Sequence, residues 1–118
     1  MLCDAGGFKH IYLAAGRTDL RKGIDGMLMV IRGEFGLDPL QLGSIFLFCG
    51  SRGDRIKALV LEEGGFVLLN KRLHKGHFQW PRNRREVMDI TEEQYHRLMD
   101  GFAIEYRSTI ERILPKYV

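Results

Sequence analysis

The sequence predicts an α+β fold in a single domain, residues 1–118, with an antiparallel β-meander packed against two helices. Three apolar runs of strand length follow one another between residues 44 and 73, and their short glycine-containing connections favour antiparallel neighbours. Two further segments, at about 19–35 and from 92 onward, repeat apolar residues at steps of three and four, as amphipathic helices do. A chain of this length has room for one domain with a modest core.

The first elements are a short strand and a helix. Residues 10–16, HIYLAAG, form an apolar run that ends in glycine, and Thr18 and Asp19 can cap the following helix through a side-chain oxygen. Gly23 and Gly26 each cost about 0.5–1 kcal/mol relative to alanine inside a helix, so we expect a close approach to a strand or a helix that starts late. The apolar stripe of this helix is Leu20, Ile24, Met27, Leu28, Ile31 and Phe35, and Gly36 ends it.

The predicted meander consists of residues 44–50, 55–63 and 65–73. The connections GSRGD and EEGG contain the glycines that tight hairpins need for positive φ. Residues 66–69 are apolar at every position, which predicts a central strand covered on both faces.

A shorter strand, REVMDI at 85–90, precedes the second helix. Thr91 and Gln94 have the spacing of a capping box, and Ile90 is placed to pack against Tyr95 across the helix start. The apolar pattern predicts that this helix continues beyond Gly101 towards Pro115.

The charge is distributed unevenly along the chain. Residues 1–49 carry 5 basic and 5 acidic side chains, residues 50–85 carry 9 and 3, and residues 86–118 carry 4 and 7. The net charge of +3 therefore results from a basic middle segment. Such an asymmetry within one small domain is typical of a surface that attracts polyanions, and solubility alone is the alternative explanation.

The basic segment 71–85 and the preceding hairpin supply the candidate nucleic-acid contacts. Phe78 and Trp80 alternate with the cations of this segment, and they have two interpretations: stacking on bases, or anchoring the loop to the core. We predict that the cations form one continuous surface that binds phosphates. They are Arg52, Arg55, Lys57, Lys71, Arg72, Lys75, Arg82, Arg84 and Arg85.

Catalytic and metal chemistry is poorly supported by the sequence. His74 and His77 have an HxxH spacing that puts their rings on opposite faces of an extended segment, and no CxxC or HExxH pattern accompanies them. We therefore expect no metal and no cofactor. Asp19 and Asp54 stand beside arginines and are interpreted as ion-pair partners, as is Asp25.

Composition indicates the compartment. The chain has no apolar run approaching the roughly 20 residues of a membrane span, and its start lacks the pattern of a secretory signal. The two cysteines, Cys3 and Cys49, form no spaced set. We expect a cytoplasmic protein with free thiols and no contact with a membrane.

The order of the motifs resembles a known family. IYLAAGRTDLRKGIDG, FGLDP, IFLFCGSRGDRIKAL and GGFVLLNKRLHKGHFQWPR follow one another as in the TnpB-type accessory proteins, encoded by the second open reading frame of IS66-family bacterial insertion sequences. The resemblance covers residues 8–102 and leaves 103–118 as a variable extension. Its motif residues are Asp19, Arg21, Lys22, Gly23, Asp25, Gly26, Asp54, Arg55, Lys57, Lys71, Arg72, Lys75, Gly76, Phe78, Trp80 and Pro81.

The resemblance implies a non-catalytic accessory role in DNA transposition, beside a separate transposase. The leading hypothesis is that the basic segment binds transposon DNA. The alternative is a protein-interaction module that binds the transposase of the same element without contacting DNA. Arg and Trp support this alternative because they are also favoured in protein interfaces. A small nuclease ranks below both. The oligomeric state is left open by the sequence.

Overall fold

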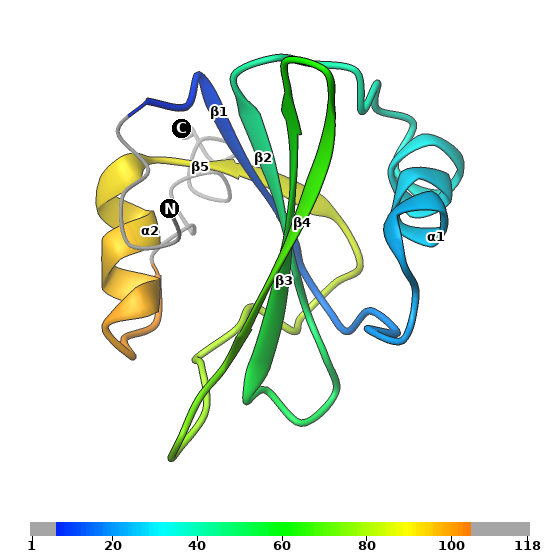
Figure 1. The fold of residues 1–118 in the computed structure, drawn as a ribbon. Helices are drawn as coiled ribbons and strands as arrows, with labels where there is room; N and C mark the ends of the chain where they lie inside the picture. Colours follow the sequence, from blue (N-terminus) through cyan, green and yellow to red (C-terminus); the bar gives the residue numbers. More distant parts are fainter. Residues whose placement is uncertain (1–6, 105–118) are drawn as a thin grey trace, which may run out of the picture.

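The computed structural model describes residues 7–104, which fold into a five-stranded mixed sheet with one helical segment on each face (Figure 1). The strands are β1 (His10–Ala14), β2 (Ser44–Cys49), β3 (Arg55–Glu62), β4 (Gly65–Arg72) and β5 (Val87–Ile90). The helices are α1 (Ile24–Met29), which continues as a π-helical turn η1 (Val30–Glu34), and α2 (Glu92–Met99). The α+β class predicted from the sequence is confirmed.

The sheet has the order β4-β3-β2-β1-β5. Strands β2, β3 and β4 form the predicted antiparallel meander, in which Glu62 pairs with Gly65 across a two-residue turn. Strand β1 pairs with β2 in parallel, because α1 and η1 carry the chain from one strand to the next over one face of the sheet. The sheet is therefore mixed, and the central strand is β2, which is buried at every position.

The prediction that residues 66–69 form a central strand is wrong. These residues lie in β4, at the edge of the sheet, and their side chains are only partly buried. An apolar run has the same appearance in a central strand and in an edge strand flanked by helices, so the pattern alone does not decide between them.

Two apolar cores lie on the two faces of the sheet. On the α1 face, Met27 and Ile31 pack with Phe46, Phe48 and Leu59. On the α2 face, buried side chains of the sheet form one cluster with side chains from α2 and the β4–β5 connection; the cluster includes Leu13, Leu47, Ile56, Trp80, Tyr95 and Leu98. Alternation along each strand produces this division, since successive side chains point to opposite faces.

The first helix starts late. It begins at Ile24 with Gly23 at the N-cap, and no side chain caps it. Thr18 and Asp19, the predicted caps, do not cap this helix, because residues 17–22 form a loop that ends before the N-cap residue Gly23. The backbone of Gly36 has φ +67° and ends the helix as predicted.

The second helix begins as predicted. Thr91 Oγ1 accepts from the Gln94 backbone N–H at 3.0 Å, and Gln94 Oε1 accepts from the Thr91 backbone N–H at 2.8 Å. Ile90 and Tyr95 are both buried in the α2-face core. The helix ends at Met99, and Gly101 has φ +95°, so the predicted continuation fails at 100–104; from residue 105 on it lies outside the described residues.

Candidate nucleic-acid interface

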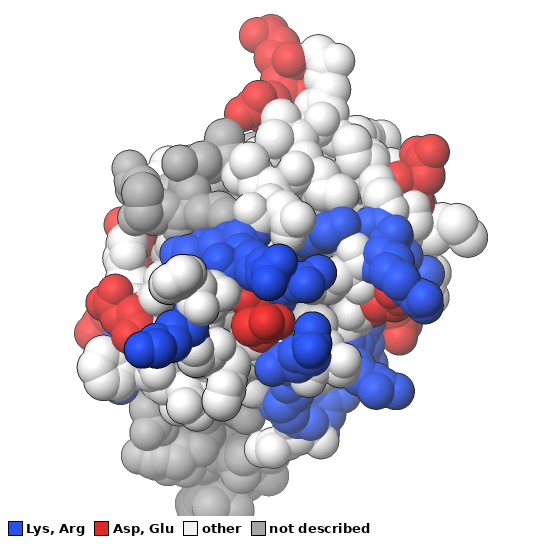
Figure 2. Space-filling model, turned by 60° about the horizontal axis from the view of Figure 1, so that its bottom comes forward, with Lys and Arg blue, Asp and Glu red and all other residues white. Residues whose placement is uncertain are grey.

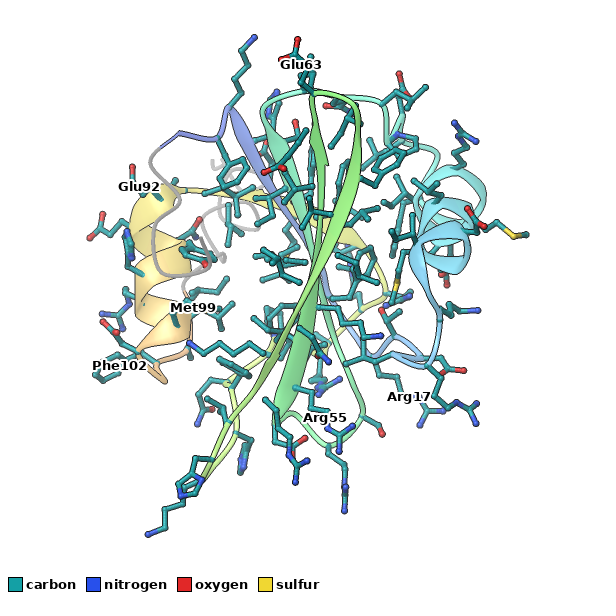
Figure 3. The ribbon with its side chains drawn as sticks, viewed as in Figure 1. Arg17, Arg55, Glu63, Glu92, Met99 and Phe102 are labelled. Atoms are coloured by element: carbon teal, nitrogen blue, oxygen red, sulfur yellow. The ribbon has the colours of Figure 1, made fainter. Side chains whose placement is uncertain are left out.

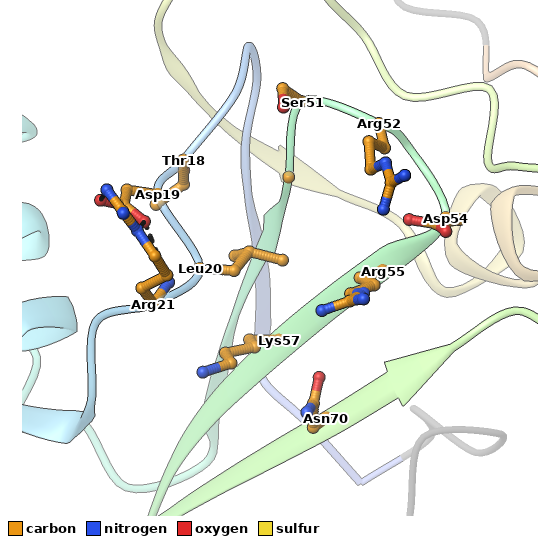
Figure 4. Close-up of a pocket in the computed structure, with 11 residues that line it drawn as sticks. Thr18, Asp19, Leu20, Arg21, Ser51, Arg52, Asp54, Arg55, Lys57 and Asn70 are labelled. Atoms are coloured by element: carbon orange, nitrogen blue, oxygen red, sulfur yellow. Dashed lines mark hydrogen bonds and ion pairs between the residues drawn. The ribbon is translucent and has the colours of Figure 1, made fainter.

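A groove opens between the 17–22 loop and the β2–β3 turn, at one end of the sheet. Its main part has a volume of about 460 Å³, and an adjoining hollow of about 420 Å³ shares Thr18, Asp19, Arg21 and Ser51 with it. Figure 4 shows the two walls, with Asp19, Leu20 and Arg21 on the loop and Arg55 and Lys57 on β3. We call it the basic groove; its charged lining is Arg17, Asp19, Arg21, Arg52, Asp54, Arg55 and Lys57.

Five cations and two carboxylates line this groove, so its charge is positive. Figure 2 shows the corresponding surface, where Lys and Arg side chains gather in a band across one end of the molecule. Arg17, Arg52 and Arg55 are exposed, and within residues 7–104 their side chains make no ion pair or hydrogen bond. Their guanidinium groups are therefore available to an anionic ligand.

Strand pairing places Arg72 beside the groove. Arg55 and Arg72 are directly opposite each other in the antiparallel β3–β4 pair, and Lys57 is opposite Asn70. Opposite residues of an antiparallel pair present their side chains on the same face, here the α1 face. Two like charges held side by side repel each other, and a phosphate bound between Arg55 and Arg72 would relieve this repulsion.

The two carboxylates of the groove have different surroundings. The Arg21 side chain donates two hydrogen bonds of 2.9 Å to the Asp19 carboxylate, and the Arg21 backbone N–H donates a third at 3.0 Å. These hydrogen bonds hold the pKa of the Asp19 carboxyl well below its usual range, and the same pair raises the pKa of Arg21. The interpretation of Asp19 as an ion-pair partner is confirmed. Asp54 forms no ion pair within the described residues, so its interpretation as a partner of Arg55 is wrong. Outside the groove, Asp25 lies in the first turn of α1 and forms none in this part of the chain either.

Two of the predicted contact residues are occupied by the protein itself. Arg82 donates to the Gly50 carbonyl at 2.7 Å and lies 3.8 Å from Cys49 Sγ, which fastens the β4–β5 connection to the β2–β3 turn. Arg85 donates to the Ala15 carbonyl at 3.1 Å and to Thr18 Oγ1 at 3.0 Å. These hydrogen bonds assign both arginines a structural role.

Arg85 also makes an ion pair with Glu34, through two hydrogen bonds of 3.1 and 3.2 Å, and its guanidinium lies 4.9 Å from the centre of the Phe35 ring. The hydrogen bonds from Arg85 lower the pKa of Glu34. This cluster joins the end of η1 to the loop that forms one wall of the basic groove. Arg85 therefore positions the groove.

The remaining predicted cations are divided between other surfaces. Lys71 is opposite Ile56 and belongs to the α2 face, away from Arg55 and Arg72. Arg84 is bound to Glu86 at 3.0 Å. Lys75 is exposed in the β4–β5 connection. Arg52, Arg55, Lys57 and Arg72 therefore lie together at the basic groove, and Arg82 is bonded to Gly50 in its lining. Binding of phosphates by the predicted cations stays a prediction.

The aromatic pair faces inward. Phe78 is 3% exposed and Trp80 is 5% exposed, and Trp80 Nε1–H donates to the Ala14 carbonyl at 2.9 Å. Phe78 N–H donates to the Gly53 carbonyl at 2.7 Å, so the segment is tied to the β2–β3 turn as well. The two rings offer no face to a nucleic-acid base and hold the connection against the core.

Cys49 is fully buried at the end of β2, and burial raises the pKa of its thiol to about 11. Within residues 7–104, no group of three or more His, Cys, Asp and Glu side chains converges as metal ligands would. In the same range, no helix is long and apolar enough to cross a membrane.

Sequence reasoning missed Arg17 and Arg21 as groove residues. The first 49 residues have no net charge. Their total therefore does not reveal that three of their five cations are concentrated at 17–22. The available signal was the run RTDLRKG, in which two arginines flank a single acid in a loop between a strand and a helix. The fold brings this run beside the motif DRIK of β3.

Comparison with known proteins places these motifs in a family. A family model described as "IS66 Orf2 like protein" matches residues 9–109. The uncharacterized protein y4hO of Sinorhizobium fredii is 31% identical over 109 residues, covering 92% of each chain. The uncharacterized protein y4jC of the same organism is 28% identical over 92 residues, covering 78% of each chain. No solved structure matches.

Proposed function

The chain belongs to the family of IS66 Orf2-like proteins, and we propose that it assists transposition by binding DNA through the basic groove. The family associates the chain with the transposase of an insertion sequence. The observation that carries the DNA-binding proposal is the convergence of two family motifs, RTDLRKG and DRIK, on one open positive groove. Arginines with free guanidinium groups are suited to bind phosphate oxygens through paired N–H donors.

The mechanism is positioning of DNA. Arg17, Arg52 and Arg55 neutralise phosphates on one strand, and the neighbouring Ser51 and Asn70 supply polar groups for sugar or phosphate oxygens. Such contacts read no base, so affinity is similar for unrelated sequences. The accessory protein would then hold transposon DNA for the transposase.

Two triple variants of equal charge test this proposal. Arg17→Gln/Arg52→Gln/Arg55→Gln removes three groove cations. Lys9→Gln/Arg32→Gln/Arg97→Gln removes three exposed cations that lie elsewhere. Fluorescence anisotropy with several unrelated duplexes should show a loss of affinity of about tenfold or more for the groove variant on every duplex, equivalent to about 1.4 kcal/mol. The control variant should stay close to wild type; equal losses for both variants would contradict a specific groove.

Direct contact with the transposase is the alternative, and the buried position of Trp80 weakens it, since that ring was the expected anchor of a protein interface. A pull-down with the transposase, with and without nuclease, separates the two. Under the DNA-binding proposal, nuclease abolishes co-purification of wild type, and the groove variant fails to co-purify even without nuclease. Retention after nuclease by both proteins would favour the alternative.

A further inference from the structure

Strand β4 leaves one long edge of the sheet open. It has eight residues, pairs with β3 on one side, and within residues 7–104 no strand pairs with its other side. Its middle, residues 66–69, is apolar and only partly buried. An edge strand with free N–H and C=O groups pairs with another strand unless charges, proline or a bulge prevent it, and residues 66–69 contain no charge and no proline.

The opposite edge of the sheet is different. Strand β5 has only four residues, includes the charged Asp89, and leads directly into α2. Short, charged edges are poor templates for pairing. The sheet therefore has one edge suited to association.

The ends of β4 have opposite charges. At the turn with β3, Glu62 and Glu63 are exposed, and Figure 3 shows Glu63 at the end of the molecule away from Arg17 and Arg55. At the other end, Lys71 and Arg72 close the strand. Two copies aligned antiparallel place the acidic turn of each beside the basic end of the other, whereas parallel alignment places like charges together.

We propose that two copies of this chain pair antiparallel along β4, about a two-fold axis near Leu68, into one continuous sheet. The edge is self-complementary in backbone hydrogen bonds, apolar centre and charge, as an isologous interface must be. Because opposite residues of an antiparallel pair share a face, an axis perpendicular to the sheet keeps both α1 faces on one side. Both basic grooves then lie on the same face of the sheet, at opposite ends of the dimer; their joint use on DNA rests on the proposed function, whereas the pairing itself does not.

Charge-reversal variants test the pairing without DNA. Glu62→Lys/Glu63→Lys makes both ends of β4 basic, and Lys71→Glu/Arg72→Glu makes both ends acidic. Light scattering after size-exclusion chromatography should give wild type about 27 kDa, twice the chain mass of 13.6 kDa. Each variant alone should run as a monomer, and circular dichroism should show that both remain folded.

The decisive sample is an equimolar mixture of the two variants. Their ends are complementary at both contacts, so the mixture should recover the dimer mass, and high salt should weaken it by screening. A monomeric wild type would overturn the proposal. So would variants that each remain dimeric, or a mixture that stays monomeric. None of these outcomes bears on DNA binding by the groove, which the anisotropy experiment measures separately.

Discussion

At the scale of single residues, Trp80 and Arg85 show how a segment that looks like a nucleic-acid surface is used to fix a loop. Trp80 lies in the core and its indole N–H satisfies the Ala14 carbonyl at the end of β1. Arg85 satisfies the next carbonyl, that of Ala15, and Thr18 beyond it. Together they hold the chain that leads from β1 into the basic groove.

Replacing Trp80 by alanine should therefore destabilise the protein by about 3–5 kcal/mol, the range for removing a buried aromatic side chain. Trp80→Phe keeps a ring but leaves the Ala14 carbonyl without its donor, and should cost about 1–3 kcal/mol. Urea unfolding followed by circular dichroism measures both. If Trp80→Ala unfolded at the wild-type midpoint, its role as an anchor would be refuted.

The ion pair between Glu34 and Arg85 should make stability depend on pH. The folded-state pKa of Glu34 lies below its ordinary value of 4.5, so its contribution is fully present above that value and is lost as pH falls through the folded-state pKa. The difference in unfolding free energy between wild type and Glu34→Gln should be larger at pH 7 than at pH 3. A Glu86→Gln control, which affects a pair joined by one hydrogen bond from Arg84, should show a smaller change; a pH-independent difference for Glu34→Gln would argue against the pair.

At the scale of elements, the helix starts show which local signals decide a structure. The capping box of α2 involves four consecutive residues and their own backbone, so the sequence predicts it fully. The start of α1 depends on whether the residues before Ile24 are helical or form a loop. Tertiary packing decides this, and the local sequence does not. Gly26 illustrates this: a Cβ there would lie 2.8 Å from Lys22 Cβ, so the close approach involves the preceding loop and not a strand.

The capping box should be measurable. Thr91→Ala removes the acceptor for the Gln94 N–H and should cost about 1 kcal/mol, whereas Thr91→Ser keeps the hydroxyl and should lie close to wild type. Thermal or urea unfolding of the two variants checks this. Equal stability of the alanine and serine variants would show that the cap contributes nothing to the fold.

The strand predictions succeeded where pairing is local and failed where it is not. The β2–β3–β4 meander follows from short connections, and residues 44–73 predict it. The position of β4 at the edge depends on β1 entering beside β2 through a helical crossover, a long-range event that the apolar pattern of residues 66–69 does not encode. The same reason explains the candidate site: Arg52, Arg55 and Lys57 are sequence neighbours and were predicted, whereas Arg17 and Arg21 join them only through the fold.

At the scale of the whole molecule, charge is separated along the sheet. The cations of the basic groove lie at one end, and the Glu62–Glu63 turn lies at the other (Figure 3). A net charge of +3 understates this separation, which directs a polyanion towards the groove. The fold thus provides a preformed positive surface whose loop walls are fastened by Arg82, Arg85 and Trp80.

The salt dependence of DNA binding tests the central claim most directly. Each phosphate contact releases condensed counterions and contributes about 0.9 to the slope of log affinity against log salt on duplex DNA. For Arg17→Gln/Arg52→Gln/Arg55→Gln, that slope should be lower than in wild type by up to about 2.7, while Lys9→Gln/Arg32→Gln/Arg97→Gln should keep the wild-type slope. A groove variant with the wild-type slope would contradict DNA binding through this groove.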